Sequence, residues 1–529
     1  MKYPIGIQEF EKIIKGNYVY VDKTALIYKL VTEGSIYFLS RPRRFGKSLL
    51  VSTLEAYFQG RKDLFKGLAI DELETEWAEY PVFHIDFNGS NFTKPNVLEE
   101  VIEKFLADQE YIYGKNPNSR DTGSRFKDIL QAAHQKTGKR AVVLIDEYDK
   151  PLLDVLDTGI STTIDGENRL LEDHHRNILK GFYSVFKSAD ANLQFVLLTG
   201  VTKFSQVSVF SGFNQPKDIS MDPRYEALCG ITEEELYQYF PAPIERLAVQ
   251  YKCSVPQMKE RLKKEYDGYH FSDVLTDIYN PFSILNVFDS NRINDYWFKT
   301  GTPTYLIRLL NHTQENLNEL TGKYYDPSEF IDYKADVEMP LPMIYQSGYL
   351  TIKDYNMDMN TYLLDFPNNE VKKGFVTMVA NDYLKSKNLA GGWARDLVDA
   401  LKSADLERFR KLLTSFLADI PYTMRRKETE RERERYFHYT FYLLMRMVSC
   451  YTVYTEKQQS EGRVDCIVET SDYIYIFEFK LDGTADEALA QIEEKGYARP
   501  YEADKRKLFK VGTVFSSETG TVSDWKVRV

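Results

Sequence analysis

The chain has 529 residues, of which 43% are hydrophobic and 28% charged, a composition that predicts several folded domains and excludes an intrinsically disordered chain. The formal net charge of −11 excludes a surface that is basic throughout, so nucleic acid would have to bind local basic patches such as "RPRR" (41–44) or "DKRKLFK" (504–510). No apolar run approaches the roughly 20 residues that cross a bilayer. The four cysteines lack paired metal-ligand spacing, so we expect a cytoplasmic protein without a membrane segment.

The first 215 residues alternate between short apolar runs and stretches with helical spacing. Strands are expected at 35–40, 80–87, 141–149 and 193–200, and a helix with a terminal glycine is expected at 47–60. The run "AVVLIDEYD" is continuously apolar before its acidic end, as in parallel strands that are buried on both faces. Residues 1–215 therefore predict an α/β domain with a parallel sheet.

Residues 216–424 read as a mainly helical middle region. One segment, 348–368, alternates between apolar and polar residues around a turn and predicts a β-hairpin. Because helices flank it, the hairpin is compatible with the wing of a winged-helix element. The charge run "RRKETERERER" (425–435), typical of a solvated helix, marks the boundary to a third domain.

Residues 425–529 predict an α+β domain. An apolar helix at 436–448 precedes three strands, "YTVYTEK", "GRVDCIVET" and "YIYIFEFKL". An amphipathic helix, "DEALAQIEEKGYA", and a further strand, "LFKVGTVFS", follow.

The stretch "SRPRRFGKSLL" (40–50) ends like a phosphate-binding loop but has Arg41 where such loops usually have glycine. Gly46 would permit close approach of the backbone to phosphate, Lys47 would bind it, and Ser48 would hold Mg²⁺. Because the usual glycine mainly eases the turn out of the strand, Arg41 need not remove a phosphate ligand. The residues expected at the nucleotide are Arg44, Phe45, Gly46, Lys47, Ser48, Leu49, Asp146 and Thr199.

The pair Asp146–Glu147 follows four apolar residues at the end of a predicted strand. Asp146 would hold Mg²⁺ through water, and Glu147 would polarise the attacking water for hydrolysis of ATP. Thr199 or Thr202, just past the fourth strand, is a candidate to sense the γ-phosphate. A site that binds ATP without hydrolysing it is the alternative.

Several motifs in this region together resemble the bacterial AAA-ATPase-like family, whose phosphate loop has the arginine-rich form "RPRRFGKS". They are "YVDKT", "FLSRPRRFGKSLL", "VVLIDEYDKPL" and "LTGVTKFS". The resemblance covers about the first 215 residues and implies a P-loop ATPase core with Lys47, Ser48, Asp146 and Glu147 in the roles given above. For "VDKT" (21–24), a structural turn is favoured over a contact near the nucleotide.

A second group of charged residues lies in the C-terminal strands. Glu478 and Lys480 are two residues apart on one strand and face the same side, and Asp465 joins them if its strand pairs with theirs. Two carboxylates and a lysine at a sheet edge would bind Mg²⁺ and orient a water against a phosphodiester. The carbonyl of Phe479 is a candidate for a further metal ligand.

The patterns "EGRVD", "IFEFK" and "ALAQIEEKGYA" are similar to the PD-(D/E)XK nuclease superfamily, over about residues 430–529. The resemblance implies catalytic roles for Asp465, Glu478 and Lys480. Gln491, Lys495 and Tyr497 either line the site or belong to a solvated helix face. Many of these nucleases also use a helix glutamate, for which Glu434 and Glu456 are both candidates.

The sequence thus predicts a multidomain α/β chain: an N-terminal P-loop NTPase domain, a mainly helical middle region and a C-terminal α+β restriction-endonuclease-like domain. We expect an enzyme with ATP and Mg²⁺ as cofactors that couples ATP binding and hydrolysis to cleavage of nucleic acid, DNA in the first place. The alternative is an ATP-dependent signalling or assembly protein whose C-terminal domain only binds nucleic acid or protein. Formation of a homo-oligomer is left open.

Overall fold

The computed structural model describes residues 1–164, 166–204, 216–297, 320–331, 340–384, 392–419, 452–459 and 462–529, with the single residues 437, 440, 441, 444 and 445. These residues form two compact units, Met1–Lys372 and Lys373–Val529. The three expected domains, with boundaries at 215/216 and 424/425, stay predictions. Within the described residues, no helix is both long enough and apolar enough to span a bilayer.

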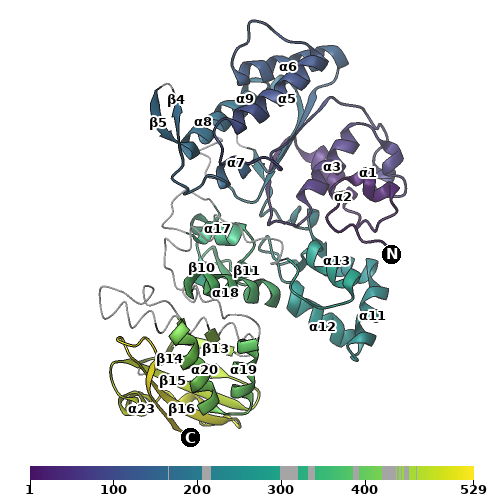
Figure 1. The fold of residues 1–529 in the computed structure, drawn as a ribbon. Coiled ribbons are helices and arrows are strands. Elements are labelled where there is room, and N and C mark those ends of the chain that lie inside the picture. Colours follow the sequence, from purple (N-terminus) through teal and green to yellow (C-terminus); the bar gives the residue numbers. More distant parts are fainter. Residues whose placement is uncertain are drawn as a thin grey trace. The chain divides into compact units, whose positions relative to one another are not determined.

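The first unit is built on a five-stranded parallel sheet with the strand order β2-β3-β6-β1-β7 (Figure 1). Its strands are β1 (Ile36–Ser40), β2 (Val82–Asp86), β3 (Ala141–Asp146), β6 (Leu193–Gly200) and β7 (Lys217–Asp218). All six residues of β3 are buried, as expected of a central parallel strand. The predicted α/β class of this region is confirmed.

Helices pack on this sheet and extend it. Helix α3 contacts β2 and β3, and α6 contacts β3 and packs with α5, α8 and α9. The helices are α1 (Phe10–Lys15), α2 (Thr24–Glu33), α3 (Lys47–Phe58), α4 (Ala69–Leu73), α5 (Val97–Tyr113), α6 (Thr122–Thr137), α7 (Lys150–Leu153), α8 (Leu171–Tyr183) and α9 (Val185–Ser188). A small hairpin of β4 (Ser161–Ile164) and β5 (Glu167–Leu170), which the sequence analysis did not predict, precedes α8.

The part of the first unit after the sheet is mainly helical. It contains α10 (Glu233–Tyr239), α11 (Pro241–Gln250), α12 (Val255–Tyr266) and α13 (Pro281–Ser290), with β8 (Ile231–Thr232) paired to β9 (Ile278–Tyr279). These helices share one apolar core, in which Leu236, Leu247, Met258 and Ile284 are buried.

The predicted hairpin is present as β11 (Thr351–Asn356) and β12 (Thr361–Asp365). A third strand, β10 (Lys323–Tyr325), pairs with β12, and α16 (Pro327–Phe330) and α17 (Leu341–Gln346) precede the hairpin. Helix α18 (Asn369–Leu384) follows it and crosses the boundary between the two units. The designation of the hairpin as a wing stays a prediction.

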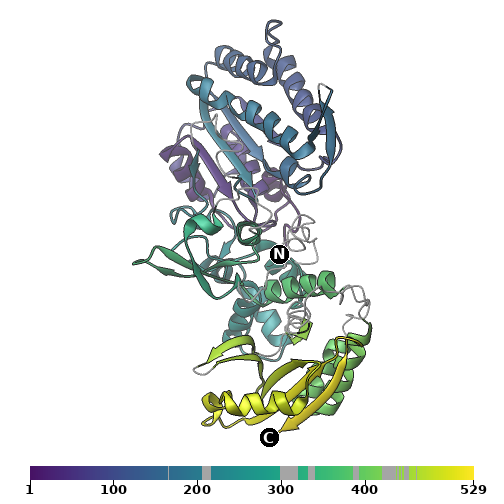
Figure 2. The same ribbon diagram turned by 90° about the vertical axis from the view of Figure 1, so that its left-hand side faces the viewer.

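The second unit is a five-stranded mixed sheet with the order β13-β14-β15-β16-β17, in which only β15 and β16 run parallel. The strands are β13 (Thr452–Gln459), β14 (Gly462–Glu469), β15 (Tyr473–Leu481), β16 (Lys507–Phe515) and β17 (Val522–Arg528). Figure 2 shows this sheet between helix α23 (Ala485–Glu494) and the helices α19 (Gly392–Lys402) and α20 (Leu406–Asp419). The α+β prediction is confirmed, although β17 was not foreseen.

Candidate functional sites

The phosphate-binding loop leaves β1 at Ser40 and ends where α3 begins at Lys47. Gly46 has a φ of 95°, a left-handed conformation that side chains disfavour. Ser48 is half-buried, and Lys47 is almost fully buried although it carries a charge. The strand–loop–helix context that the motif requires is therefore present.

Each residue of "RPRRF" contacts the chain beyond residue 216. Arg41 donates to the carbonyl of Ser220 (2.7 Å) and stacks on Phe271 (4.1 Å). The partners of the other four residues follow: Pro42 lies against Gly348, the Arg43 carbonyl accepts from Trp297 Nε1 (3.1 Å), Arg44 stacks on Phe282 (4.9 Å), and Phe45 packs on Tyr269 and Phe271. The extra arginines thus tie the loop to the middle region.

The side chain of Lys47 is held by its own loop. Its Nζ donates to the carbonyl oxygens of Arg41 (3.0 Å) and Pro42 (3.3 Å). Two carbonyl dipoles stabilise the buried ammonium, because a desolvated charge is costly without such partners. A phosphate at the loop would compete with these carbonyls for the ammonium.

Asp146 and Glu147 stand at the carboxyl end of β3. Asp146 is 3% exposed and accepts hydrogen bonds from the hydroxyl of Thr199 (2.5 Å) and the N–H of Glu147 (3.1 Å). Glu147 has a φ of 51°, which is uncommon outside glycine, and its side chain lines the cavity beside the loop. The structure therefore brings both acidic residues to the phosphate loop, with Thr199 positioning Asp146.

Asp149 connects this strand end to the segment after β6. Its carboxylate accepts the N–H groups of Val201 (3.0 Å) and Thr202 (2.6 Å), and burial raises its pKa to about 6. The next residue, Lys203, donates its N–H to Gln346 on α17 (2.8 Å). Thr202, the other sensor candidate, is itself fully buried.

A cavity of about 380 Å³ lies over the loop. Gly46, Lys47, Ser48 and Glu147 line one part of it, and Leu49 and Arg44 also face it. This volume falls in the range of about 300–1,000 Å³ that small-molecule sites occupy. The residue types fit a nucleotide with Mg²⁺, since Ser48 offers a hydroxyl and Asp146 a nearby carboxylate.

In the second unit, β14 and β15 pair as the expected antiparallel hairpin, with Cys466 opposite Phe477. Asp465 therefore comes beside Glu478, and its carboxylate accepts the N–H of Phe479 (2.7 Å). Lys480 Nζ donates to the amide oxygen of Gln491 (2.5 Å), and the Gln491 amide donates in turn to Glu478. The three residues predicted to be catalytic thus share one site, joined through Gln491.

Glu478 is the buried member of this site. It is 1% exposed, and its Oε2 has no hydrogen-bond partner among the described residues. Burial and then the adjacent Asp465 carboxylate raise the pKa of Glu478. An orphaned buried carboxylate beside a second one fits a divalent cation, for which oxygen atoms are the preferred ligands.

Helix α23 brings Gln491 to the site because it packs closely on β16. A Cβ at Gly512 would clash with the carbonyl oxygen of Ala485, so glycine permits this approach. Tyr497, after the helix, is 2% exposed and belongs to the apolar core, and Lys495 caps the helix end. Of these three candidates, the described contacts join Gln491 to the carboxylates.

Two further candidates concern the nuclease-like site. Glu456 lies in β13 between residues paired with Val464 and Cys466, which places its backbone beside that of Asp465. Glu434 and the charge run 425–435 lie outside the described residues. The Phe479 carbonyl stays a predicted ligand.

Known proteins resemble both halves of the chain. The family model "Predicted AAA-ATPase" matches residues 4–210, and the "PD-(D/E)XK nuclease superfamily" model matches residues 432–525. Over 533 residues, the chain is 35% identical to an "Uncharacterized protein in vnfD 5'region" of Azotobacter chroococcum mcd 1, with 100% of this chain and 99% of that protein covered. The chain belongs to the AAA-ATPase-like family. Its C-terminal part belongs to the PD-(D/E)XK nuclease superfamily.

In this AAA-ATPase-like protein, "VDKT" forms a structural turn. Asp22 accepts from the N–H groups of Thr24 and Ala69 (2.8 Å each), and Lys23 pairs with Glu235 on α10 (2.5 Å). The turn therefore joins the start of α2 to α4 and α10, in line with the structural reading.

The two basic patches are engaged within the protein. Arg41 is buried and Arg44 stacks on Phe282. In the second patch, Arg506 pairs with Glu469 (2.9 Å) and Asp504 (2.7 Å). These contacts reduce the positive charge that either patch offers to nucleic acid.

Several residues of the nucleotide cavity were missed by the sequence analysis. They are Asn88 after β2, the N-terminal segment Pro4–Gln8 and the start of α13. Asn88 was detectable in principle, because β2 and β3 are parallel neighbours and end at the same edge, with Asp86 paired to Asp146. The other two segments reach the cavity through tertiary contacts that no local pattern signals.

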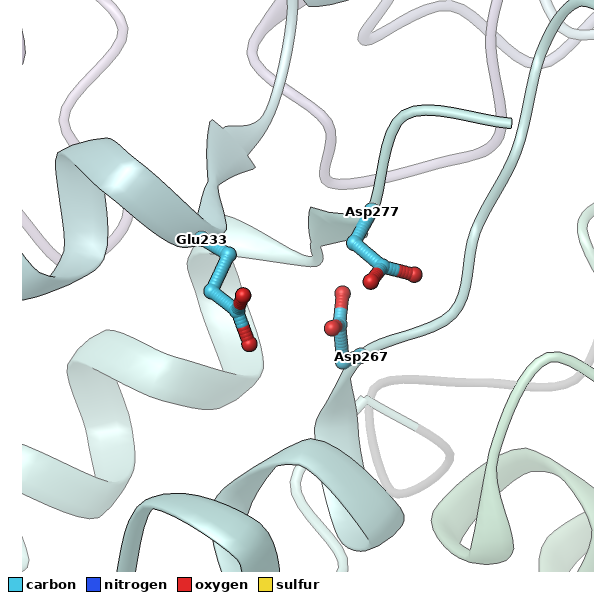
Figure 3. Close-up of side chains that lie close together, drawn as sticks. All are labelled: Glu233, Asp267 and Asp277. Carbon is cyan, nitrogen blue, oxygen red and sulfur yellow. The ribbon is translucent and has the colours of Figure 1, made fainter. Parts of the chain in front are cut away.

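A third group of carboxylates lies in the helical region. Figure 3 shows Glu233, Asp267 and Asp277 turned toward one another, with one oxygen of each within 4.8 Å of the others. Lys263 Nζ lies 2.6 Å from Asp277 and 3.2 Å from Glu233 and so already supplies a cation. Asp267 is 1% exposed, its oxygens have no hydrogen-bond partner among the described residues, and burial raises its pKa to about 7.

Proposed function

We propose that this protein binds and hydrolyses ATP at the phosphate loop and cleaves phosphodiester bonds of nucleic acid, DNA in the first place, at the C-terminal sheet. The observation that carries the nuclease activity is the convergence of Asp465, Glu478 and Lys480 around a buried carboxylate oxygen without a partner. The cavity that joins Lys47, Ser48 and Glu147 supports the ATPase activity.

At the phosphate loop, Lys47 would leave the carbonyls of Arg41 and Pro42 for the ATP phosphates, with backbone N–H groups of residues 44–49 around them. Ser48 and Asp146 would hold Mg²⁺, which offsets the phosphate charge. Glu147 faces the cavity and would orient the attacking water and accept its proton.

At the C-terminal sheet, Asp465 and Glu478 would hold Mg²⁺, with the Phe479 carbonyl as a further ligand. The ion would lower the pKa of a bound water and offset charge on the scissile phosphate. Lys480, held at 2.5 Å by Gln491, would orient the nucleophile or stabilise the developing negative charge.

ATP turnover by the Glu147→Gln variant tests the ATPase activity. We expect hydrolysis to fall by about a hundredfold or more while ATP binding is retained, because only the group that accepts the proton of water is lost. Glu518→Gln, an exposed position of the second unit, is the matched control. Hydrolysis at the wild-type rate in Glu147→Gln would refute the role of Glu147.

Cleavage of labelled single- and double-stranded DNA and RNA by Lys480→Ala tests the nuclease activity. We expect a loss of about a hundredfold or more with unchanged folding, since the lysine is half-exposed. Lys507→Ala, an exposed lysine on the neighbouring strand β16, should cleave like the wild type. Absence of cleavage in the wild type on every substrate, with and without ATP, would favour a C-terminal domain that only binds.

A further inference from the structure

The cavity over the phosphate loop extends well beyond the loop itself. At its far side it is bounded by the N-terminal segment Pro4–Gln8 and by Pro281, Phe282 and Leu285 of α13. These two segments are some 270 residues apart in the sequence, yet both face the same space as Lys47 and Ser48. The cavity therefore has a polar end at the loop and a more apolar end away from it.

A second, smaller cavity of about 100 Å³ adjoins the apolar end. Both cavities are lined by Pro4, Gly46, Leu49, Pro281 and Leu285. Most of the other side chains around the smaller cavity are apolar, among them Phe45 and Phe240. It is an apolar slot beside the loop.

The wall formed by α13 is fixed in place. Asn280 caps the helix by accepting the N–H groups of Phe282 (2.9 Å) and Ser283 (3.2 Å), and Pro281 stands at the first helical position. Ser283 also donates to the buried Glu370 (2.7 Å). The residues that face the cavity are thus held in a preformed arrangement.

The loop and this wall are also in direct contact. Arg44 lies with its guanidinium 4.9 Å from the ring of Phe282, and the Arg43 carbonyl accepts from Trp297. A ligand that contacts both Gly46–Ser48 and α13 would therefore bridge the sheet and the helical region.

We propose that the base and ribose of the bound nucleotide occupy the apolar end of this cavity, between Pro4–Gln8 and the first turn of α13, with the base directed into the slot beside Leu49 and Leu285. This inference rests on the proposed ATP binding at the phosphate loop. Small-molecule sites combine apolar walls with a few polar groups that fix orientation, and here the polar groups are at the phosphate end. The helical region thereby becomes part of the nucleotide site and responds to its occupancy.

Binding of ATP and of inorganic triphosphate, both with Mg²⁺, tests the inference by calorimetry. Wild-type protein should bind ATP at least about tenfold more tightly, because burial of about 60 Å² of apolar surface corresponds to a tenfold change in affinity. In Leu285→Trp, which fills the slot, ATP affinity should fall to that of triphosphate, and triphosphate affinity should stay unchanged. Val249→Trp, at an exposed position of α11, is the control.

The outcomes separate the inference from the proposed function. Equal affinities of the wild type for ATP and triphosphate would overturn the base site but leave the phosphate site intact. A wild type that binds neither would overturn both. If Leu285→Trp does not fold, Phe282→Ala replaces it, with the same selective loss of ATP affinity expected.

Photolabelling of the wild-type chain with 8-azido-ATP gives a test that needs no variant. The label should be found in peptides that contain Pro4–Gln8 or Pro281–Leu285, and excess ATP should prevent labelling. Specific labelling confined to other segments would overturn the proposed position of the base.

Discussion

The two sites differ in how their charges are satisfied without ligands. At the phosphate loop, the ammonium of Lys47 is buried but held by two carbonyl oxygens of the same loop. At the C-terminal sheet, Glu478 is equally buried, yet one of its oxygens has no hydrogen-bond partner among the described residues. The first site is internally compensated, and the second lacks a positive partner.

This difference indicates how each site should respond to ligands. A nucleotide must displace Lys47 from its carbonyls, so part of the binding free energy is offset by lost internal contacts. A divalent cation at Glu478 would instead relieve an existing desolvation penalty and lower the raised pKa of that carboxyl group.

Removal of the lysine should have the largest effect. Lys47→Ala should weaken ATP binding by about a hundredfold or more, because one charge-assisted contact with the phosphates disappears. Equilibrium binding of a fluorescent ATP analogue measures this change. Lys29→Ala, on α2 outside the cavity lining, is the control, and unaltered binding in Lys47→Ala would contradict the assignment of the loop.

The loop arginines provide the next test, since Arg41 is buried and Arg43 is exposed. Arg41→Met should cost about 3 kcal/mol of unfolding free energy, because buried carbonyls lose a charged donor. Arg43→Met should change stability by no more than about 0.5 kcal/mol. Denaturant unfolding measures both, and equal effects would show that Arg41 does not anchor the loop.

Addition of Mg²⁺ tests the missing positive partner at Glu478. A concentration one hundred times the dissociation constant should stabilise the wild type by about 2.7 kcal/mol through binding to the folded state alone. Thermal unfolding without nucleotide measures this effect, and the unfolding step of the second unit should lose it in Glu478→Gln. An undiminished Mg²⁺ effect on that step in Glu478→Gln would place the ion elsewhere.

The carboxylates around Lys263 should give the smallest effect. Because the folded-state pKa of Asp267 is raised to about 7 by burial and by Asp277, the wild type should lose stability as the pH rises from about 4 to 7. Asp267→Asn does not titrate, so its advantage should grow over that window to about 1–2 kcal/mol and then level off. Unfolding midpoints between pH 4.5 and 8 test this, and a variant less stable than the wild type at pH 8 would contradict the sign.

Much of each site followed from local pattern. The spacing of Gly46–Ser48 after an apolar strand located the loop, and period-two alternation placed Glu478 and Lys480 on one face. The pairing of β14 with β15 then brought in Asp465 as expected.

Other features depend on tertiary contacts. The partners of Arg41 and Arg44 lie between residues 220 and 282, and nothing in "RPRRF" identifies them. The role of α13 in the cavity is likewise invisible, since its capping by Asn280 reads as an ordinary helix start. Strand β17 carries alternating charges at the sheet edge, a pattern that does not distinguish a strand from a surface loop.

The central claim, a metal-dependent nuclease site at the C-terminal sheet, is tested most directly by cleavage of DNA by the wild type and Asp465→Ala with and without Mg²⁺. The account predicts cleavage by the wild type that requires Mg²⁺ and falls by about a thousandfold in Asp465→Ala, while Glu518→Ala cleaves normally. Cleavage that persists in Asp465→Ala, or in the wild type without any divalent cation, would contradict it.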